Sequence, residues 1–390
     1  MFIEALKKQN SKLVEAATHF WQRGEILPDS YVIDVDQFMD NGRQLLEAAQ
    51  ANSIELYVMS KQIGRNPFLV KKLIDIGYRG AVAVDFKEAN ILNKHRIPLC
   101  HLGHLVQIPD GLIKPLLQAQ PEVVTLFSLE KAAKISEAAQ ALNCVQPVLL
   151  KFIREGDNLY PGQEAGFDFN QIEQTVGAIN KLSGIKIVGV THFPCLLWNE
   201  QQQTTQITPN LQTLTDAAQA LKLLDIDVLQ INGPSASSIS TFTLLAHHGI
   251  THTEPGHAFT GTIPANQSGT QPEKIAMVYL TEVSHQFAGN TYCFGGGYYR
   301  RGNAHNALVF TADNQYHSAS ILPIDSSCID YHIPLAGNYP VGSAVVMCFR
   351  TQIFVTRSDV VLISGISQGT PKLEGIYNGQ GQWIKESYLG

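Results

Sequence analysis

The sequence predicts an α/β fold in which a (β/α)8 TIM-like barrel is followed by a β-rich C-terminal domain. From about residue 54, short apolar runs alternate with segments of helical period, which is typical of βα units around a parallel sheet. These runs number eight, the number of strands that closes a barrel. After about residue 265, short alternating runs rich in Val, Tyr, Phe, Gly and Thr indicate an all-β domain.

The chain before the barrel contributes a helical segment and one strand. Residues 1–29 read as an amphipathic helical segment with acidic and basic residues interspersed, without the continuous apolar stretch of a signal peptide. The run SYVIDVD (30–36) is strand-like, and we expect it to join the sheet of the β-rich domain. We therefore expect three parts: the helical segment 1–29, a barrel domain over 30–264 and a β-rich domain over 265–390.

Each barrel strand is predicted from a short run of β-branched and apolar residues bounded by turn residues. Two of the intervening helices begin at capping residues, Ser128 and Thr208. The predicted strands are 54–61, 80–85, 99–104, 123–128, 147–153, 186–192, 227–232 and 249–254.

Composition excludes several classes of protein. A formal net charge of −6 over 390 residues leaves no basic surface for nucleic acid or an anionic membrane. The six cysteines are scattered without a C-x-x-C pair, which argues against a disulfide framework and fits a reducing cytosol. No run approaches the length of a membrane span. We expect a cytoplasmic protein that acts on a small molecule.

Functional groups of a βα barrel collect where its strands end. An amine, histidines, a Gly/Ser turn and a carboxylate on a Pro-Gly turn together suggest a covalent amine beside an anion cradle. The strand ends in order carry Lys61, Asp85, His104, Ser128, Arg154, His192, the run 232–235 and the run 254–257.

Two glycine-containing turns suit a phosphate. NGPSASS (232–238) and EPGHAFTG (254–261) both present glycine and backbone N–H groups before a helix or turn. FGGGYYRRG (294–302) lacks the strand-then-helix context of a dinucleotide fingerprint. The histidines of AHHGITHTEPGH (246–257) lack an acid or thiol to complete a tetrahedral set, so we expect no metal site.

In this order the motifs resemble the fold-type III pyridoxal-phosphate enzymes, a group that includes alanine racemase, ornithine-type decarboxylases and D-threonine aldolase. The resemblance rests on Lys61 at the end of the first barrel strand, GVTHFP (189–194), INGPSAS (231–237) and THTEPGHAFTG (251–261). The whole chain resembles the YhfX-type branch, which is described as amino acid racemase-like.

The resemblance implies a site for pyridoxal 5'-phosphate. Lys61 would hold the cofactor as a Schiff base, which requires an amine kept neutral by burial and nearby cations. His192 would pack against its ring, and Arg65 would supply a cation where racemases carry a phosphate-binding tyrosine. The remaining cofactor-binding residues implied are Gly233, Ser235, Glu254, Gly256 and His257.

Departures from the racemase pattern bear on the chemistry. Glu254 stands where alanine racemases have arginine, and a carboxylate there stabilises a protonated cofactor ring. The racemase turn Gly-Tyr-Gly-Gly, which carries a catalytic tyrosine, reads Cys293-Phe294-Gly295-Gly296 here. Cys293, Tyr298 or Tyr299 would replace that base, unless the reaction needs none. The run 348–354 lacks the His-x-Cys zinc pair of the D-serine dehydratase branch.

The resemblance implies a PLP-dependent enzyme acting at Cα of an amino acid. An isomerase, either a racemase or an epimerase, is the first expectation. A decarboxylase or an aldolase is the alternative favoured by Glu254 and by the absent tyrosine, and a non-catalytic PLP carrier is the alternative of another class. The family also implies a head-to-tail homodimer in which the segment 293–301 faces the partner's Lys61.

Overall fold

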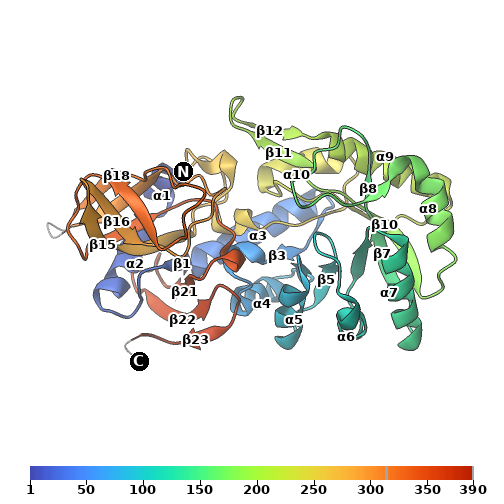
Figure 1. Cartoon of the computed structure of the whole chain (residues 1–390), viewed down its shortest axis with the longest axis horizontal. Coiled ribbons are helices and arrows are strands. Elements are labelled where there is room, and N and C mark those ends of the chain that lie inside the picture. Colours follow the sequence, from blue (N-terminus) through green and yellow to red (C-terminus); the bar gives the residue numbers. More distant parts are fainter. Residues whose placement is uncertain (312–314, 389–390) are drawn as a thin grey trace. The chain divides into compact units, whose positions relative to one another are not determined.

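A computed structural model describes residues 1–311 and 315–388 and divides the chain into two compact units (Figure 1). The barrel unit comprises Leu45–Ser60 and Val70–Pro255. The β-rich unit comprises Met1–Gln44, Lys61–Leu69 and Gly256–Gly390. The predicted fold class, a parallel α/β barrel followed by a β-rich domain, is confirmed.

The barrel unit is built on one parallel sheet in the order β2-β14-β13-β10-β7-β6-β5-β4-β3. Its strands are short and buried, as expected where helices cover the outer face. They are β2 (Glu55–Leu56), β3 (Val58–Met59), β4 (Ala81–Ala83), β5 (Leu99–Leu102), β6 (Val123–Leu126), β7 (Gln146–Leu150), β10 (Ile185–Thr191), β13 (Gln230–Asn232) and β14 (His252–Thr253).

Helices and short ribbons connect these strands. Figure 1 shows α5, α6 and α7 along one side of β5 and β7. The helices of the chain from residue 35 to 247 are α3 (Val35–Ala51), α4 (Pro67–Asp75), α5 (Phe86–Lys94), α6 (Ile113–Gln118), α7 (Leu129–Ala141), α8 (Ile172–Ile179), α9 (Pro209–Leu223) and α10 (Ile239–His247). The ribbons pair β8 (Phe152–Ile153) with β9 (Phe167–Asp168), and β11 (Leu196–Asn199) with β12 (Thr204–Ile207).

The predicted strand 147–153 is interrupted at Lys151. β7 ends at Leu150, and Phe152 begins the separate ribbon β8. The Lys151 carbonyl accepts a hydrogen bond from the Phe167 backbone N–H at 2.8 Å, which takes the chain away from the barrel sheet. A run of apolar residues cannot reveal this change of partner, because both strands need the same residue types.

The β-rich unit is built on a sheet in the order β18-β17-β20-β15-β1-β21-β22-β23, with β16 and β19 added beside β15. The early strand β1 (Ser30–Asp34) lies between β15, which is antiparallel to it, and β21, which is parallel. The other strands are β15 (Met277–Phe287), β16 (Asn290–Phe294), β17 (Asn306–Phe310), β18 (Tyr316–Ser320), β19 (His332–Ala336), β20 (Ala344–Met347), β21 (Asp359–Ser364), β22 (Lys372–Asn378) and β23 (Trp383–Lys385).

Two N-terminal helices complete the core of the β-rich unit. From α1 (Ile3–Gln9) and α2 (Ser11–Gln22), the buried side chains of Leu6 and Leu13 share a hydrophobic cluster with Val32 of the sheet. The helices α1 and α2 therefore pack into the core of the β-rich unit. Within the described residues, no helix has the length and apolar character needed to cross a membrane.

Candidate active site

A fully buried carboxylate, Glu254, follows β14 at the carboxyl edge of the barrel. One of its oxygens, Oε1, lies 2.7 Å from His101 Nδ1 and accepts a hydrogen bond from Asn232 Nδ2, also at 2.7 Å. Its second oxygen, Oε2, is buried and has no hydrogen-bond partner among the residues that the structure describes. The barrel therefore holds an acidic group by one oxygen and leaves the other available.

The charge of Glu254 is maintained despite its burial. Burial alone would raise the pKa of the carboxyl group. The charges of His104 and His101 and the hydrogen bonds from His101 and Asn232 outweigh this effect and lower the pKa of Glu254 to about 2. An ionised acid with a free oxygen is suited to accept a hydrogen bond from a protonated ring nitrogen.

The sequence analysis did not identify His101 as a site residue. It lies inside β5, with Nε2 2.5 Å from Thr125 Oγ1 of β6. One ring nitrogen therefore contacts Glu254 and the other contacts the neighbouring strand. His104, a predicted strand-end residue, packs its ring 4.9 Å from that of His101. Strand alternation was the available signal, since His101 occupies an inward-facing position within the run LCHLGH.

His192 is held by both ring nitrogens. Nδ1 accepts the Phe193 backbone N–H at 2.8 Å, so Nε2 is the donor to Asp157 Oδ2 at 2.9 Å. Asn210 Nδ2 lies 3.3 Å from the same Nδ1. With both edges occupied, the residue presents a fixed flat face, which suits packing against a ligand ring better than transferring protons.

The loop before α10 has the backbone of an anion cradle. Ser235 and Ala236 adopt consecutive positive φ values of 99° and 49°, a turn backbone of the kind that can present N–H groups to an anion. The Ser235 hydroxyl donates to the Leu196 carbonyl, and a Cβ on Gly233 would meet Ile250 at 3.1 Å. The backbone of this loop is therefore a stronger candidate for phosphate binding than the Ser235 side chain.

Lys61, Gly256 and His257 lie together in the β-rich unit. β3 ends at Met59, and Ser60 follows it. Lys61 then begins a 3-10 turn, Lys61–Ile63. A Cβ at Gly256 would lie 2.4 Å from Gln62 Oε1, so the Gln62 amide packs directly against this glycine. Burial, and then the charges of Arg350 and Lys61, lower the pKa of His257 well below its usual value. His257 is therefore neutral beside the lysine amine.

Arg65 is buried within the β-rich unit and makes contacts there. It is 2 % exposed, its Nη1 donates to Gln380 Oε1 at 2.6 Å, and its guanidinium lies 5.0 Å from the centre of the Phe354 ring. These contacts give Arg65 a structural role in orienting the turn that follows Lys61, and its assignment as a phosphate ligand remains a prediction.

The two residues predicted to replace the missing tyrosine differ in accessibility. Cys293 of β16 is 0 % exposed, and burial raises the pKa of its thiol to about 12, so it is poorly suited to remove a proton. Tyr298 is half-buried, and its backbone N–H donates to Asp330 Oδ2 at 3.0 Å. We therefore do not assign Cys293 as the second base.

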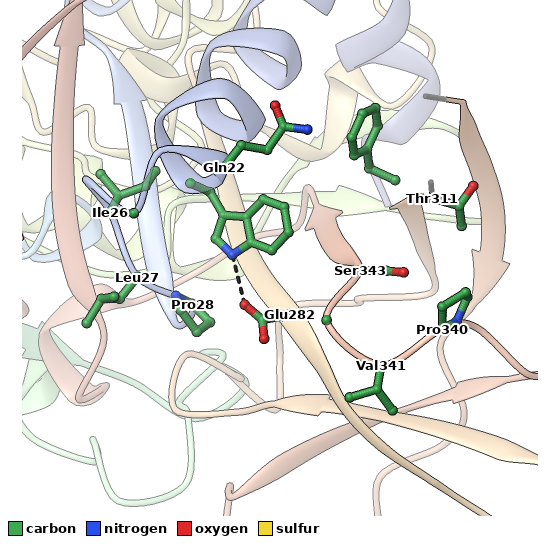
Figure 2. A pocket seen from close by; sticks show the side chains of 13 residues that line it. Gln22, Ile26, Leu27, Pro28, Glu282, Thr311, Pro340, Val341 and Ser343 are labelled. Carbon is green, nitrogen blue, oxygen red and sulfur yellow. Dashed lines mark hydrogen bonds between the residues drawn. The ribbon is translucent and has the colours of Figure 1, made fainter. Parts of the chain in front are cut away.

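A separate pocket of about 560 Å³ lies on the β-rich unit (Figure 2). Within it the Trp21 indole N–H donates to Glu282 Oε2 at 3.0 Å, beside Pro28 and Val341. The pocket includes none of the predicted site residues, and its lining offers no cluster of catalytic groups.

Comparisons with known proteins agree with these motifs. Residues 33–264 match the family described as "Alanine racemase, N-terminal domain". The chain belongs to the alanine racemase family. Residues 278–373 of this alanine racemase family member match the family described as "YhfX-like, C-terminal domain". It is 53% identical over 382 residues, which is 98% of this chain and 99% of the relative, to "Uncharacterized protein YhfX" from Escherichia coli (strain K12).

Solved structures share the fold of this alanine racemase family member at low identity. D-threonine aldolase from Filomicrobium marinum has a TM-score of 0.66 and 13% identity over 91% of this chain and 95% of its own. Alanine racemase of Clostridium difficile 630 has a TM-score of 0.62 and 15% identity over 90% of this chain and 99% of its own. Diaminopimelate decarboxylase from M. jannaschii has a TM-score of 0.63 and 14% identity over 96% of this chain and 92% of its own. These likenesses show the fold and not the reaction.

Replacing His101 with Phe should destabilise the barrel in a pH-dependent manner. The folded pKa of Glu254, about 2, lies below its ordinary value of 4.5, so its ionisation stabilises the fold above pH 4.5, and this contribution is lost as pH falls through about 2. We expect a loss of up to roughly 3 kcal/mol at pH 7 that fades toward pH 2. Urea unfolding at several pH values measures it.

The control for this variant is His247→Phe, which changes an exposed histidine at the end of α10 and should alter stability by less than about 0.5 kcal/mol. A loss in His101→Phe that is the same at every pH would mean that His101 contributes packing and not charge stabilisation.

Proposed function

We propose that the protein binds pyridoxal 5'-phosphate covalently through Lys61 and breaks a bond at Cα of an amino acid, with racemisation or epimerisation as the first assignment. Members of the family that matches residues 33–264 depend on this cofactor, which supports the proposal. The single observation that carries it is Glu254, a buried and ionised carboxylate with one free oxygen at the edge of the barrel.

The residues present fit the cofactor. The free oxygen of Glu254 would accept a hydrogen bond from the protonated pyridine nitrogen. The loop with positive φ at Ser235 and Ala236 would bind the phosphate through backbone N–H groups. His192, held at both nitrogens, would pack its face against the ring. Lys61 supplies the amine, beside the neutral His257.

Bound pyridoxal phosphate supplies an electron-withdrawing ring that stabilises negative charge at Cα of an attached amino acid. In this chain Glu254 would keep that ring protonated, because it is an anion held in place by His101 and Asn232. Because these partners are buried and fixed, they need no rearrangement when charge develops. The arrangement suits any reaction that passes through a carbanion at Cα.

A decarboxylase or an aldolase is the alternative within the same class. It is favoured by the carboxylate at position 254 and by the burial of Cys293, which leaves no replacement for the racemase tyrosine at that position. Exchange of the α-proton with retention of the carboxyl group would indicate a racemase, whereas release of carbon dioxide would indicate a decarboxylase. A non-catalytic PLP carrier would do neither with any amino acid.

Lys61→Ala should abolish covalent cofactor binding without unfolding the chain. Borohydride reduction of the yellow wild-type protein should fix the cofactor onto Lys61, which peptide mass mapping identifies. Lys71→Ala, which removes an exposed lysine from α4, is the matched control and should label as the wild type does. Label on a different lysine would refute the site assignment.

Glu254→Gln should retain the cofactor but lose most of the reaction rate. The amide oxygen can still accept from His101 and Asn232, so the fold is preserved while the negative charge is removed. Losing a charge-assisted hydrogen bond and the ring proton costs about 2–4 kcal/mol, or roughly 30- to 1,000-fold in rate. Turnover per bound cofactor is the measurement, with the thermal midpoint as a check on folding. Unchanged turnover would remove Glu254 from the mechanism.

We also propose that the protein forms a head-to-tail homodimer and acts in the cytoplasm. The β-rich unit exposes large apolar side chains near the segment 293–301, with Phe294 39 % and Tyr331 61 % exposed. Sedimentation velocity should give twice the mass of the chain for wild type and a monomer for Phe294→Asp. Trp383→Asp, at an exposed residue of β23, should remain dimeric. A fully active wild-type monomer would exclude this arrangement.

A further inference from the structure

A second lysine, Lys151, is buried in the barrel unit and belongs to none of the motifs above. It is 3 % exposed, although lysine is almost never buried unless its charge is paired. No ion pair or side-chain hydrogen bond among the described residues includes its amine. Nζ lies 5.4 Å from the centre of the Phe127 ring. A buried amine without a carboxylate partner calls for a chemical reason.

Strand register puts the Lys151 side chain on the inner face of the barrel. In β7, Leu149 pairs with Thr125 of β6, and the Thr125 hydroxyl contacts His101 beside Glu254. Lys151 comes two residues after Leu149, and its backbone N–H still donates to the Leu126 carbonyl of β6 at 3.4 Å. Residues two apart along a strand project to the same face of a sheet. Lys151 therefore shares a face with Thr125.

That face is the one that holds Glu254. The Asn232 amide donates to Glu254 Oε1 at 2.7 Å, and the Thr191 hydroxyl lies 3.4 Å from His104 Nδ1. Lys151 thus lies at the carboxyl edge of the barrel, on the inner face that presents the proposed partner of the cofactor ring.

The nearest acid does not neutralise Lys151. Asp157 Oδ2 accepts from His192 Nε2 and from the Arg154 backbone N–H, each at 2.9 Å, and Oδ1 accepts from Thr213 at 2.8 Å. Burial lowers the pKa of the Lys151 amine, and attraction to Asp157 only partly opposes this. A larger share of the amine is therefore neutral, and a neutral amine is a base.

We propose that Lys151 is a second proton-transfer residue for the reaction at Cα. It takes the role of the racemase tyrosine, for which Cys293 is too deeply buried. The neutral amine takes the Cα proton of one enantiomer and becomes an ammonium, while the electron pair of the C–H bond stays with the substrate. Inversion would be completed by the Lys61 ammonium, which donates a proton to the opposite face of Cα; in the reverse direction the Lys61 amine would take the proton and the Lys151 ammonium would donate one. This inference rests on the proposed function.

Two substitutions separate proton transfer from simple charge. Lys151→Met removes the amine, and Lys151→Arg keeps a positive charge but cannot deprotonate. Lys186→Met, at an exposed lysine of β10, is the matched control. Each protein, loaded with pyridoxal phosphate, is incubated in D2O with each proteinogenic L-amino acid and its D-enantiomer. Proton NMR follows loss of the Cα signal, and chiral chromatography follows inversion.

For the amino acid that wild type inverts, both Lys151 variants should lose at least about 100-fold in inversion rate, whereas Lys186→Met keeps it. Borohydride should still fix the cofactor onto Lys61 in every variant. Full inversion by either Lys151 variant would overturn the inference while leaving the proposed function intact. A wild type that exchanges no α-proton would remove the proposed function and the role of Lys151 with it.

A second measurement does not depend on activity. In cofactor-free protein labelled with [13Cε]-lysine, the signal lost in Lys151→Arg should titrate below the ordinary lysine range, whereas the signal lost in Lys186→Met should titrate within it. A Lys151 amine that titrates with the surface lysines would overturn the inference, whatever the enzyme assays show.

Discussion

Closure of the barrel by residues 55–59 is the constraint on which the rest of the structure depends. These residues form one extended segment that is hydrogen-bonded on both sides. The Tyr57 and Met59 N–H groups donate to the Thr253 and Pro255 carbonyls at 3.1 and 3.0 Å, and the Val58 N–H donates to Gly80 at 2.9 Å. A closed parallel sheet has no free edge, so these short strands have hydrogen-bonded neighbours on both sides.

Closure also decides where the chain leaves the barrel. Because Met59 pairs with Pro255, the segments that follow, from Lys61 and from Gly256, begin side by side. Both belong to the β-rich unit, where the Gln62 side chain packs against Gly256. The amine predicted to hold the cofactor and the glycine of the acidic turn are therefore brought together by a backbone hydrogen bond, although they are far apart in the sequence.

The inner face of the barrel tolerates charge because each ion is fixed by several partners. Glu254 is held by His101 and Asn232, and Asp157 by His192 and Thr213. Isolated buried ions are costly, and these pairings reduce the cost while keeping the groups rigid. Lys151 differs, because Asp157 attracts its amine without an ion pair among the described residues, and Nζ lies 5.4 Å from the centre of the Phe127 ring.

The sequence by itself determined the order of strands and helices, the change to an all-β domain and the strand-end residues Lys61, His192 and Glu254, because periodicity and turn chemistry are local properties. The contact of His101 with Glu254 and the burial of Cys293 follow from the tertiary structure alone. They depend on which strands pair and in what register, and residues such as Leu150 and Val190 carry no local trace of that pairing.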